Sequence, residues 1–303
     1  MTSPITPQGT MQPWPTVGVV IPVYNDWPGL QQCLQALAVQ SYPAGRFRVR
    51  VVDNGSTDWP AVPEFPLPVE VIRHSQPGSY GARNRAALDW FVEVLAFTDA
   101  DCQPVPDWLE QGVLALGSSG SSSVVAGRIE LQALRPDQPS LAEQLDRILG
   151  FDQARTVRRA GYGVTANLFV AQAHLQTLGG FCSHTRSGGD REFCQRARAA
   201  GLLIRYAPAS VVYHPARNWP GLVAKQRRIV GGRLSLAGAS PLKRLQVLVL
   251  SLRPLLSESW RVLRVDALPL LLRLKLLGRV MVLRGLVLIE WLRLQWPGQQ
   301  PSR

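Results

Sequence analysis

Short apolar runs alternate with segments of helical periodicity over roughly the first two thirds of the chain. The β-branched run 17–22 predicts a buried strand, and residues 28–40 place apolar side chains at helical spacing after Pro28. Further strands are predicted at 47–53, near 69–73, at 94–98 and at 123–131, and further helices near 78–94, at 106–116, at about 140–159 and at 190–201. Strands that alternate with helices predict an α/β fold with a mainly parallel sheet, covered by helices on both faces.

Polar clusters follow three of the predicted strands. These clusters are Tyr24-Asn25-Asp26, Asp53-Asn54-Gly55-Ser56 and Asp99-Ala100-Asp101. Ligands of open parallel sheets bind beyond the carboxyl ends of the strands. The three clusters therefore predict where a functional site lies.

The charge is unevenly distributed along the 303 residues. Residues 1–216 contain 17 basic and 18 acidic side chains, whereas residues 217–303 contain 16 basic and three acidic ones. The segment 241–303 consists of Leu-rich stretches with single basic residues, interrupted by prolines. Its charge-free runs are far shorter than the ~18 residues that span a bilayer.

Leucine-rich helices with scattered arginines and tryptophans suit the headgroup region of an anionic membrane. The alternative is a helical appendage that packs on the catalytic domain or in a dimer. Nucleic acid is disfavoured as a partner, because the basic residues lie among leucines rather than among glycine, serine and stacking aromatics.

The chain is predicted to have three parts. Residues 1–15 form a flexible N-terminus without the pattern of a secretory signal, residues 16–240 form the catalytic domain, and residues 241–303 form the basic helical tail. Four scattered cysteines lack the spacing of a zinc site or a disulfide framework, which suits a reducing compartment. We expect a cytoplasmic protein, peripheral at the inner face of the membrane.

The distribution of lysine excludes several phosphate-binding enzymes. The three lysines are Lys225, Lys243 and Lys275, so residues 1–216 contain none. A P-loop and a protein-kinase site each need a lysine in that region. The first predicted strand is also not followed by the G-x-G-x-x-G pattern of dinucleotide-binding enzymes.

Asp99 and Asp101 form a D-x-D motif directly after an apolar run. Two carboxylates at a strand end repel each other unless a cation lies between them and a bound anion. A hard divalent ion held by carboxylate and phosphate oxygens would also stabilise a departing diphosphate. The alternative is a pair of solvated turn aspartates.

Three further polar residues have both a functional and a structural interpretation. Asp53 can accept hydrogen bonds from a base or a ribose hydroxyl, or close an Asx-turn. Asp190 can act as a general base for an acceptor hydroxyl, or cap the helix that follows it. His214 can ligate a metal, or simply end a strand.

Together these segments resemble the family 2 glycosyltransferases, which share the A-type glycosyltransferase fold. The resemblance covers residues 17 to about 233. Its carriers are VVIPVYN (19–25), VVDNGSTD (51–58), PGSYGARNRA (77–86), FTDADCQPVPDWL (97–109), GYGVTANLF (161–169), GGDREFCQRARAAG (188–201) and VVYHP (211–215).

The resemblance implies a role for each matching residue. Pro22, Tyr24, Asn25 and Asp53 would border the nucleoside. Arg83 and Asp99 would face the sugar nucleotide. Asp101 would be the main contact of Mg²⁺ or Mn²⁺, with His214 near the metal or the diphosphate. Asp190 would be the catalytic base of a single displacement that inverts the anomeric centre.

The sequence departs from the family pattern at two points. The residue before the base is often Glu but is Gly189 here, and the Q-x-x-R-W block of many processive members is absent. The first departure leaves the base itself in place. The second favours transfer of one sugar over polymerisation.

The resulting prediction is an inverting, metal-dependent glycosyltransferase that moves a hexosyl or related group. A UDP-sugar is the expected donor and a saccharide or lipid-linked saccharide the expected acceptor, which suits cell-envelope, polysaccharide or glycolipid synthesis. One alternative is a sugar-phosphate nucleotidyltransferase, although residues 17–30 lack the Arg and Lys of its triphosphate loop. Another is a non-catalytic membrane-surface binding module.

Overall fold

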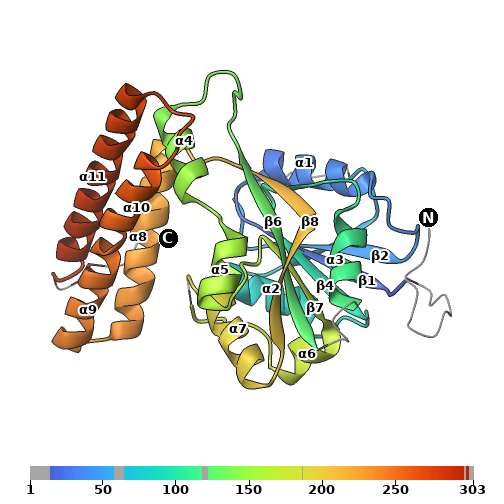
Figure 1. Ribbon diagram of the computed structural model, residues 1–303. Helices are drawn as coiled ribbons and strands as arrows, with labels where there is room; N and C mark the ends of the chain where they lie inside the picture. Colours follow the sequence, from blue (N-terminus) through green and yellow to red (C-terminus); the bar gives the residue numbers. More distant parts are fainter. Residues whose placement is uncertain (1–13, 58–64, 118–121, 186, 297, 300–303) are drawn as a thin grey trace. The chain divides into compact units, whose positions relative to one another are not determined.

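The computed structural model describes residues 14–57, 65–117, 122–185, 187–296 and 298–299, so most of the predicted N-terminal segment, and Asp58, lie outside it. Two compact units make up the chain (Figure 1). The first comprises Met1–Glu130 and Asp152–His214, and the second Leu131–Phe151 and Pro215–Arg303.

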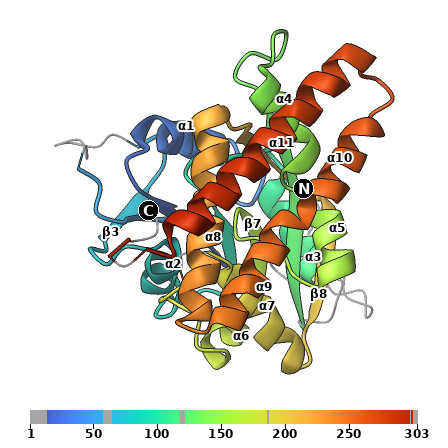
Figure 2. The same ribbon diagram turned by 90° about the vertical axis from the view of Figure 1, so that its left-hand side faces the viewer.

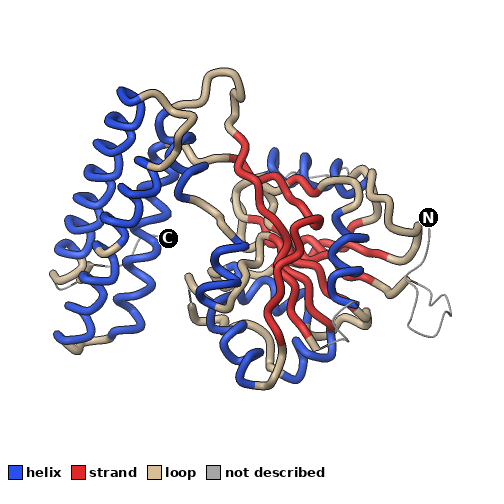
Figure 3. Tube along the Cα trace, in the orientation of Figure 1, coloured by secondary structure: helices blue, strands red, loops and turns tan. Residues whose placement is uncertain are grey.

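The first unit is built on an eight-stranded sheet with the order β3-β2-β1-β4-β7-β6-β8-β5 among the described residues (Figure 3). Its strands are β1 (Val17–Val23), β2 (Phe47–Asp53), β3 (Val69–Arg73), β4 (Val94–Thr98), β5 (Gln103–Pro104), β6 (Ser123–Gln132), β7 (Asn167–Ala171) and β8 (Leu203–Pro215). The pairs formed by β1, β2, β3 and β4 are parallel, whereas β4–β7, β6–β7 and β5–β8 are antiparallel. The sheet is therefore mixed rather than mainly parallel, because β7, in a stretch with no strand prediction, lies beside β4.

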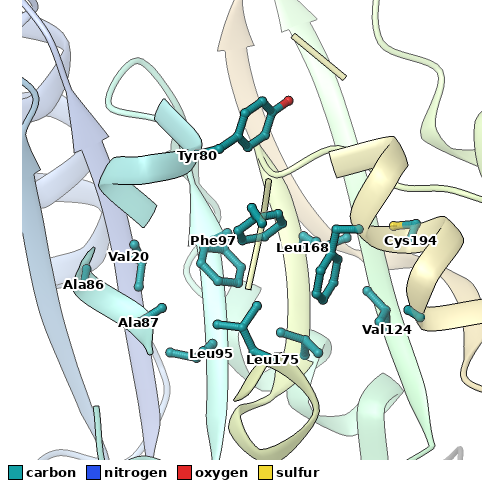
Figure 4. Packing of buried hydrophobic residues seen from close by; sticks show 14 of the residues in the cluster. Val20, Tyr80, Ala86, Ala87, Leu95, Phe97, Val124, Leu168, Leu175 and Cys194 are labelled. Atoms are coloured by element: carbon teal, nitrogen blue, oxygen red, sulfur yellow. The ribbon is translucent and has the colours of Figure 1, made fainter. Parts of the chain in front are cut away.

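Helices cover both faces of this sheet. They are α1 (Trp27–Ala38), α2 (Ser79–Ala87), α3 (Trp108–Gly117), α5 (Gln153–Ala160), α6 (Gln172–Thr177) and α7 (Gly189–Ala199). Phe97 of β4 and Leu168 of β7 share one apolar cluster with α2 and α7 (Figure 4). Phe169 points to the opposite face, where its ring lies 5.1 Å from that of Trp108 on α3. The predicted α/β class is confirmed.

Two predicted helices have different limits in the structure. The helix near 78–94 ends at Ala87, because residues 88–93 turn and the Glu93 amide donates to the Thr16 carbonyl. The helix at 140–159 is two helices, α4 (Leu141–Leu149) and α5. Ser140 caps the first of them and Asp152 caps the second, so each begins with its own capping residue.

The second unit is helical. It contains α4, α8 (Trp219–Ala237), α9 (Pro241–Leu252), α10 (Pro254–Leu263) and α11 (Leu270–Arg293). Helix α11 contacts the other four helices and crosses in front of α8 in Figure 2. One apolar cluster holds Leu145, Val262 and Val280, and another holds Val230 and Val287.

Three prolines of the tail lie at helix starts. Pro241 and Pro254 begin α9 and α10, and Pro269 directly precedes α11, where the missing amide proton costs no helical hydrogen bond. The predicted helical tail is confirmed. Helices α4 and α8 belong to the same compact unit as the tail. The boundary at 240/241 between a catalytic domain and the tail stays a prediction.

No helix in the described ranges combines the length and the apolar character needed to cross a bilayer.

Candidate active site

The carboxyl ends of three neighbouring parallel strands carry the predicted polar clusters. Strands β2, β1 and β4 are adjacent in the sheet, and they end beside Asp53, Asn25 and Asp99 respectively. Because parallel strands end at the same edge, the sheet brings these clusters together there.

Asn25 joins the loop after β1 to the loop after β2. Its backbone amide donates to Ser56 Oγ at 2.9 Å, and its Oδ1 accepts from the Thr57 amide at 2.9 Å. These bonds hold Asn25 in the left-handed region at φ 49°, an uncommon conformation for a non-glycine residue. Its neighbour Tyr24 is 48% exposed and Pro22 is half-buried, so both can meet a ligand.

Asp53 closes the turn after β2. Its Oδ1 accepts from the Ser56 amide at 2.9 Å, three residues further on, which is one residue further than in an Asx-turn. Its other carboxylate oxygen, Oδ2, lies 4.0 Å from Nε of Arg73. The buried carboxylate therefore keeps one oxygen that is not used by the turn.

Asn54 is a structural residue of this edge that the sequence analysis did not single out. Its Oδ1 accepts from the Gly78 amide at 2.8 Å, and its Nδ2 donates to the carbonyls of His74 and Gln76. The side chain thus fixes the loop that leads into α2. Its place after Asp53 indicated only a turn, because its partners lie 20 to 24 residues further along the chain.

Helix α2 delivers Arg83 to Asp99. The Arg83 side chain is buried, and its guanidinium donates to Asp99 Oδ1. Arg83 Nε has no hydrogen-bond partner, one of three such buried side-chain atoms among the described residues. A buried donor left unsatisfied is costly, so an incoming oxygen that reached it would be stabilised.

Strands β5 and β8 bring Asp101 and His214 together. The pairing of Gln103 with Tyr213 places the residue before β5 beside the end of β8. His214 Nε2 lies 3.5 Å from Asp101 Oδ2, and Cys102 completes a cluster whose possible ligand atoms lie within 4.8 Å of one another. This spacing suits two ligands of a single cation.

The donor set at this cluster fits Mg²⁺ or Mn²⁺ through Asp101 and His214. A carboxylate oxygen and an imidazole nitrogen are ligands that Mn²⁺ accepts, and phosphate oxygens of a donor complete such a shell. Cys102 fits less well, because burial, and next the nearby carboxylates, raise the pKa of its thiol well above the ordinary value. The protonated thiol is a poor ligand for a hard cation.

Asp190 lies in the first turn of α7 rather than at its cap. Gly188 is the N-cap residue, with φ 84°, and Asp190 Oδ1 accepts from the Arg191 amide at 2.8 Å. The capping interpretation of Asp190 was therefore wrong, while the predicted end of the helix at Gly201 holds, at φ 88°. Burial raises the pKa of the Asp190 carboxyl, and the charges of Arg83 and Asp99 act on it. Asp190 thus belongs to the same site as the Arg83–Asp99 pair.

Comparison with known proteins agrees with this geometry. The model of the family named "Glycosyl transferase family 2" matches residues 18–161. Glycosyltransferase AglE of Haloferax volcanii is 35% identical over 226 residues, which cover 73% of this chain and 73% of that protein. The chain belongs to glycosyl transferase family 2.

Other similar proteins are more distant. The pre-mycofactocin glycosyltransferase of Mycobacterium tuberculosis is 30% identical, over 67% of this chain but only 43% of its own length. The mannosyltransferase PcManGT from Pyrobaculum calidifontis, solved with GDP-Man and Mn²⁺, has a TM-score of 0.59 at 18% identity, over 95% of this chain and 92% of its own. TarS of S. aureus, solved with UDP-GlcNAc, has a TM-score of 0.51 at 19% identity, over 88% of this chain and 71% of its own.

These similarities confirm the predicted family, the A-type glycosyltransferase fold and the glycosyltransferase activity. They give no support to the alternatives of a nucleotidyltransferase or a non-catalytic module. The roles of the individual site residues stay predictions.

Proposed function

We propose that this family 2 glycosyltransferase is metal-dependent and inverting, and that it moves one sugar from a nucleotide-diphosphate sugar to an acceptor hydroxyl. The observation that supports this most is the arrangement around the D-x-D motif. Asp101 lies 3.5 Å from His214, Asp99 is paired with Arg83, and Asp190 lies within the electrostatic reach of that pair.

The donor side of the site is formed by the strand ends. Asp101 and His214 would hold Mg²⁺ or Mn²⁺, which supplies positive charge for the leaving diphosphate when it is bound. Arg83 and Asp99 orient the sugar nucleotide, with Asp99 towards the ribose or the donor sugar. Pro22, Tyr24, Asn25 and the Asp53 oxygen that the turn leaves unused border the nucleoside.

The acceptor side is formed by Asp190. Its carboxylate takes the proton of the acceptor hydroxyl, and the hydroxyl oxygen forms the new bond to the anomeric carbon. The bond from that carbon to the diphosphate breaks, and the nucleoside diphosphate leaves with the electron pair. Attack opposite the leaving group inverts the anomeric centre. A raised pKa brings the base closer to the pH at which it works, which favours proton transfer.

A nucleotide-sugar panel tests the donor. We expect a UDP-sugar with Mn²⁺ to raise the melting temperature more than GDP- or dTDP-sugars, and each gain to shrink without metal. A ligand stabilises the fold according to its concentration relative to Kd. The measurement is a thermal-shift titration at fixed ligand concentration. Equal shifts with and without Mn²⁺ for every donor would contradict the metal-dependent site.

The surface of α9–α11 is the basis for proposing both where the enzyme works and what its acceptor is. We propose that the enzyme is cytoplasmic and peripheral at an anionic membrane, and that it glycosylates a saccharide or a lipid-linked saccharide in cell-envelope or glycolipid synthesis. Sixteen of the 21 large apolar side chains that are exposed among the described residues lie between Leu242 and Trp296. Clustering of this kind marks an interaction surface.

The charges of α9–α11 favour anionic lipid as the partner of that surface. Two of the three acids of this segment are paired within the helical unit: Glu258 with Arg284 at 2.8 Å, and Glu290 with Arg293 at 2.7 Å. The exposed charged residues between 241 and 296 are one acid, Asp266, and the basic Lys243, Arg253, Arg264, Lys275 and Arg279. A positive apolar surface is attracted to an anionic bilayer and repelled by a second copy of itself.

A vesicle experiment tests this membrane surface. Leu271→Gln, Leu274→Gln and Ile289→Gln together remove exposed apolar side chains of α11, which should release the protein from vesicles that contain anionic phospholipid. Salt should also weaken wild-type binding, because screening acts on the basic residues. The measurement is co-sedimentation.

A matched control uses exposed apolar residues that are not part of these helices. Phe91→Gln with Leu134→Gln changes side chains that are 92% and 88% exposed, and should leave sedimentation unchanged. Wild-type protein that stays in the supernatant at low salt would contradict the membrane proposal. So would a concentration-dependent dimer that the α11 variant abolishes.

A further inference from the structure

Gly189, the residue before the proposed base, is explained by its contact with Tyr80. Its backbone is helical, so no unusual φ angle requires glycine there. A Cβ added to Gly189 would lie 2.7 Å from Cδ2 and 2.8 Å from Cε2 of Tyr80, closer than packed atoms allow. Any side chain at this position would therefore displace the Tyr80 ring.

Tyr80 lies at the edge of the apolar cluster between α2 and α7. Its side chain is 7% exposed, and its ring lies 5.9 Å from that of Phe181. Figure 4 shows its hydroxyl pointing away from the labelled apolar side chains. The ring is thus held by packing while the polar end is directed out of the core.

The Tyr80 side chain faces the first turn of α7. Its ring lies against Gly189, and its hydroxyl is close enough to Asp190 that interactions with the carboxylate and the backbone of Asp190 affect the pKa of both side chains. A tyrosine at this place can fix the direction of that carboxylate. It also links the first turn of α2 to the first turn of α7.

Other groups also act on the Asp190 carboxyl. Arg83 on α2 and the Arg191 amide on α7 favour the charged form, as does the Tyr80 hydroxyl, whereas burial and the charge of Asp99 favour the neutral form. The buried Cys194 thiol, one turn further along α7, is within the electrostatic reach of Asp190. The Tyr80 hydroxyl is uncharged, so it can be removed without changing the net charge of the site.

We propose that Tyr80 is a positioning residue that orients the Asp190 carboxylate towards the acceptor, and that Gly189 is glycine to admit its ring. The inference rests on the proposed role of Asp190 as the base. It explains the departure from the family pattern at position 189, because the Tyr80 ring of α2 occupies the space that a side chain there would fill.

The test is Tyr80→Phe, which keeps the ring and removes the hydroxyl. Because the hydroxyl stabilises the carboxylate, its loss should move the acidic limb of kcat/KM for the acceptor to higher pH, on the order of one pH unit. The donor KM should be unchanged. A purely structural role would lower the melting temperature and leave the limb in place.

Two further variants make the result specific. Tyr42→Phe removes another buried hydroxyl, which donates to the Pro15 carbonyl at 2.7 Å, and should leave the limb in place. Gly189→Ala should move the limb in the same direction as Tyr80→Phe, and have little further effect in the double variant. If Tyr80→Phe folds poorly, Gly189→Ala still tests the inference.

An unchanged limb in both Tyr80→Phe and Gly189→Ala would overturn the inference. Failure of the proposed base has a different signature, because Asp190→Asn would then retain transfer. The two outcomes are therefore distinguishable in the same assay.

Discussion

Asp190→Asn is expected to lower the rate of sugar transfer by about 10²–10⁴-fold, because an amide cannot take the proton of the acceptor hydroxyl. Asparagine has nearly the same shape, so donor binding should persist. The measurement is transfer of labelled sugar at saturating donor, with donor binding followed by thermal shift. Asp89→Asn changes an exposed carboxylate that pairs with Arg85, and should keep full activity.

The pH dependence of this variant carries a second expectation. Burial raises the pKa of Asp190 in the folded enzyme, so the folded state holds this proton more tightly than the unfolded chain does. Ionisation of Asp190 therefore destabilises the fold as the pH rises through the raised pKa. At neutral pH Asp190→Asn should melt no lower than the wild type, and its residual rate should lack the acidic limb of the wild-type profile. A variant that lost activity because it unfolded would melt lower.

Asp101→Ala is expected to abolish metal-dependent donor binding. A bound divalent ion contributes several kcal/mol to stabilising a leaving diphosphate, so transfer should fall on the order of 10³-fold. The direct measurement is a titration of Mn²⁺ by electron paramagnetic resonance in the presence of nucleoside diphosphate. The wild type should remove one equivalent of free Mn²⁺, and Asp101→Ala should remove none.

Two matched variants define what the Asp101 result means. His214→Ala removes the other side of the 3.5 Å pair and should weaken Mn²⁺ binding in the same titration. Asp137→Ala removes an exposed carboxylate and should bind Mn²⁺ like the wild type. Undiminished Mn²⁺ binding by Asp101→Ala would exclude the proposed ligand set.

The strand ends were predictable because local signals mark them. Short apolar runs followed by Asn, Asp and Gly indicated β1, β2 and β4 and the polar residues beyond each of them. Asp99 was marked in this way too, whereas the place of Arg83 beside the sugar nucleotide was implied by the resemblance to the family 2 glycosyltransferases. Helix starts in the tail were marked by proline in the same local way.

The parts that were missed depend on contacts between distant residues. Strand β5 has two residues and exists only because it pairs with β8, about 110 residues further along. Strand β7 begins with Asn167, whose side chain bonds to Trp108 and to the carbonyls of Arg128 and Ser210, and none of these partners is visible as a local pattern. The contact of the Tyr80 ring with Gly189 joins two helices in the same way. The hydrophobic periodicity of a sequence cannot predict such pairings.

The late position of β8 has a consequence for how the enzyme becomes active. A chain still under synthesis holds β1 and β2, the proposed nucleoside side of the sheet, long before Tyr213 can pair with Gln103. A register slip of one residue in that pairing would turn His214 to the opposite face of its strand. Among the proposed site residues, His214 is therefore the last to be synthesised, and we expect a truncated or misregistered product to bind a nucleotide sugar without transferring its sugar.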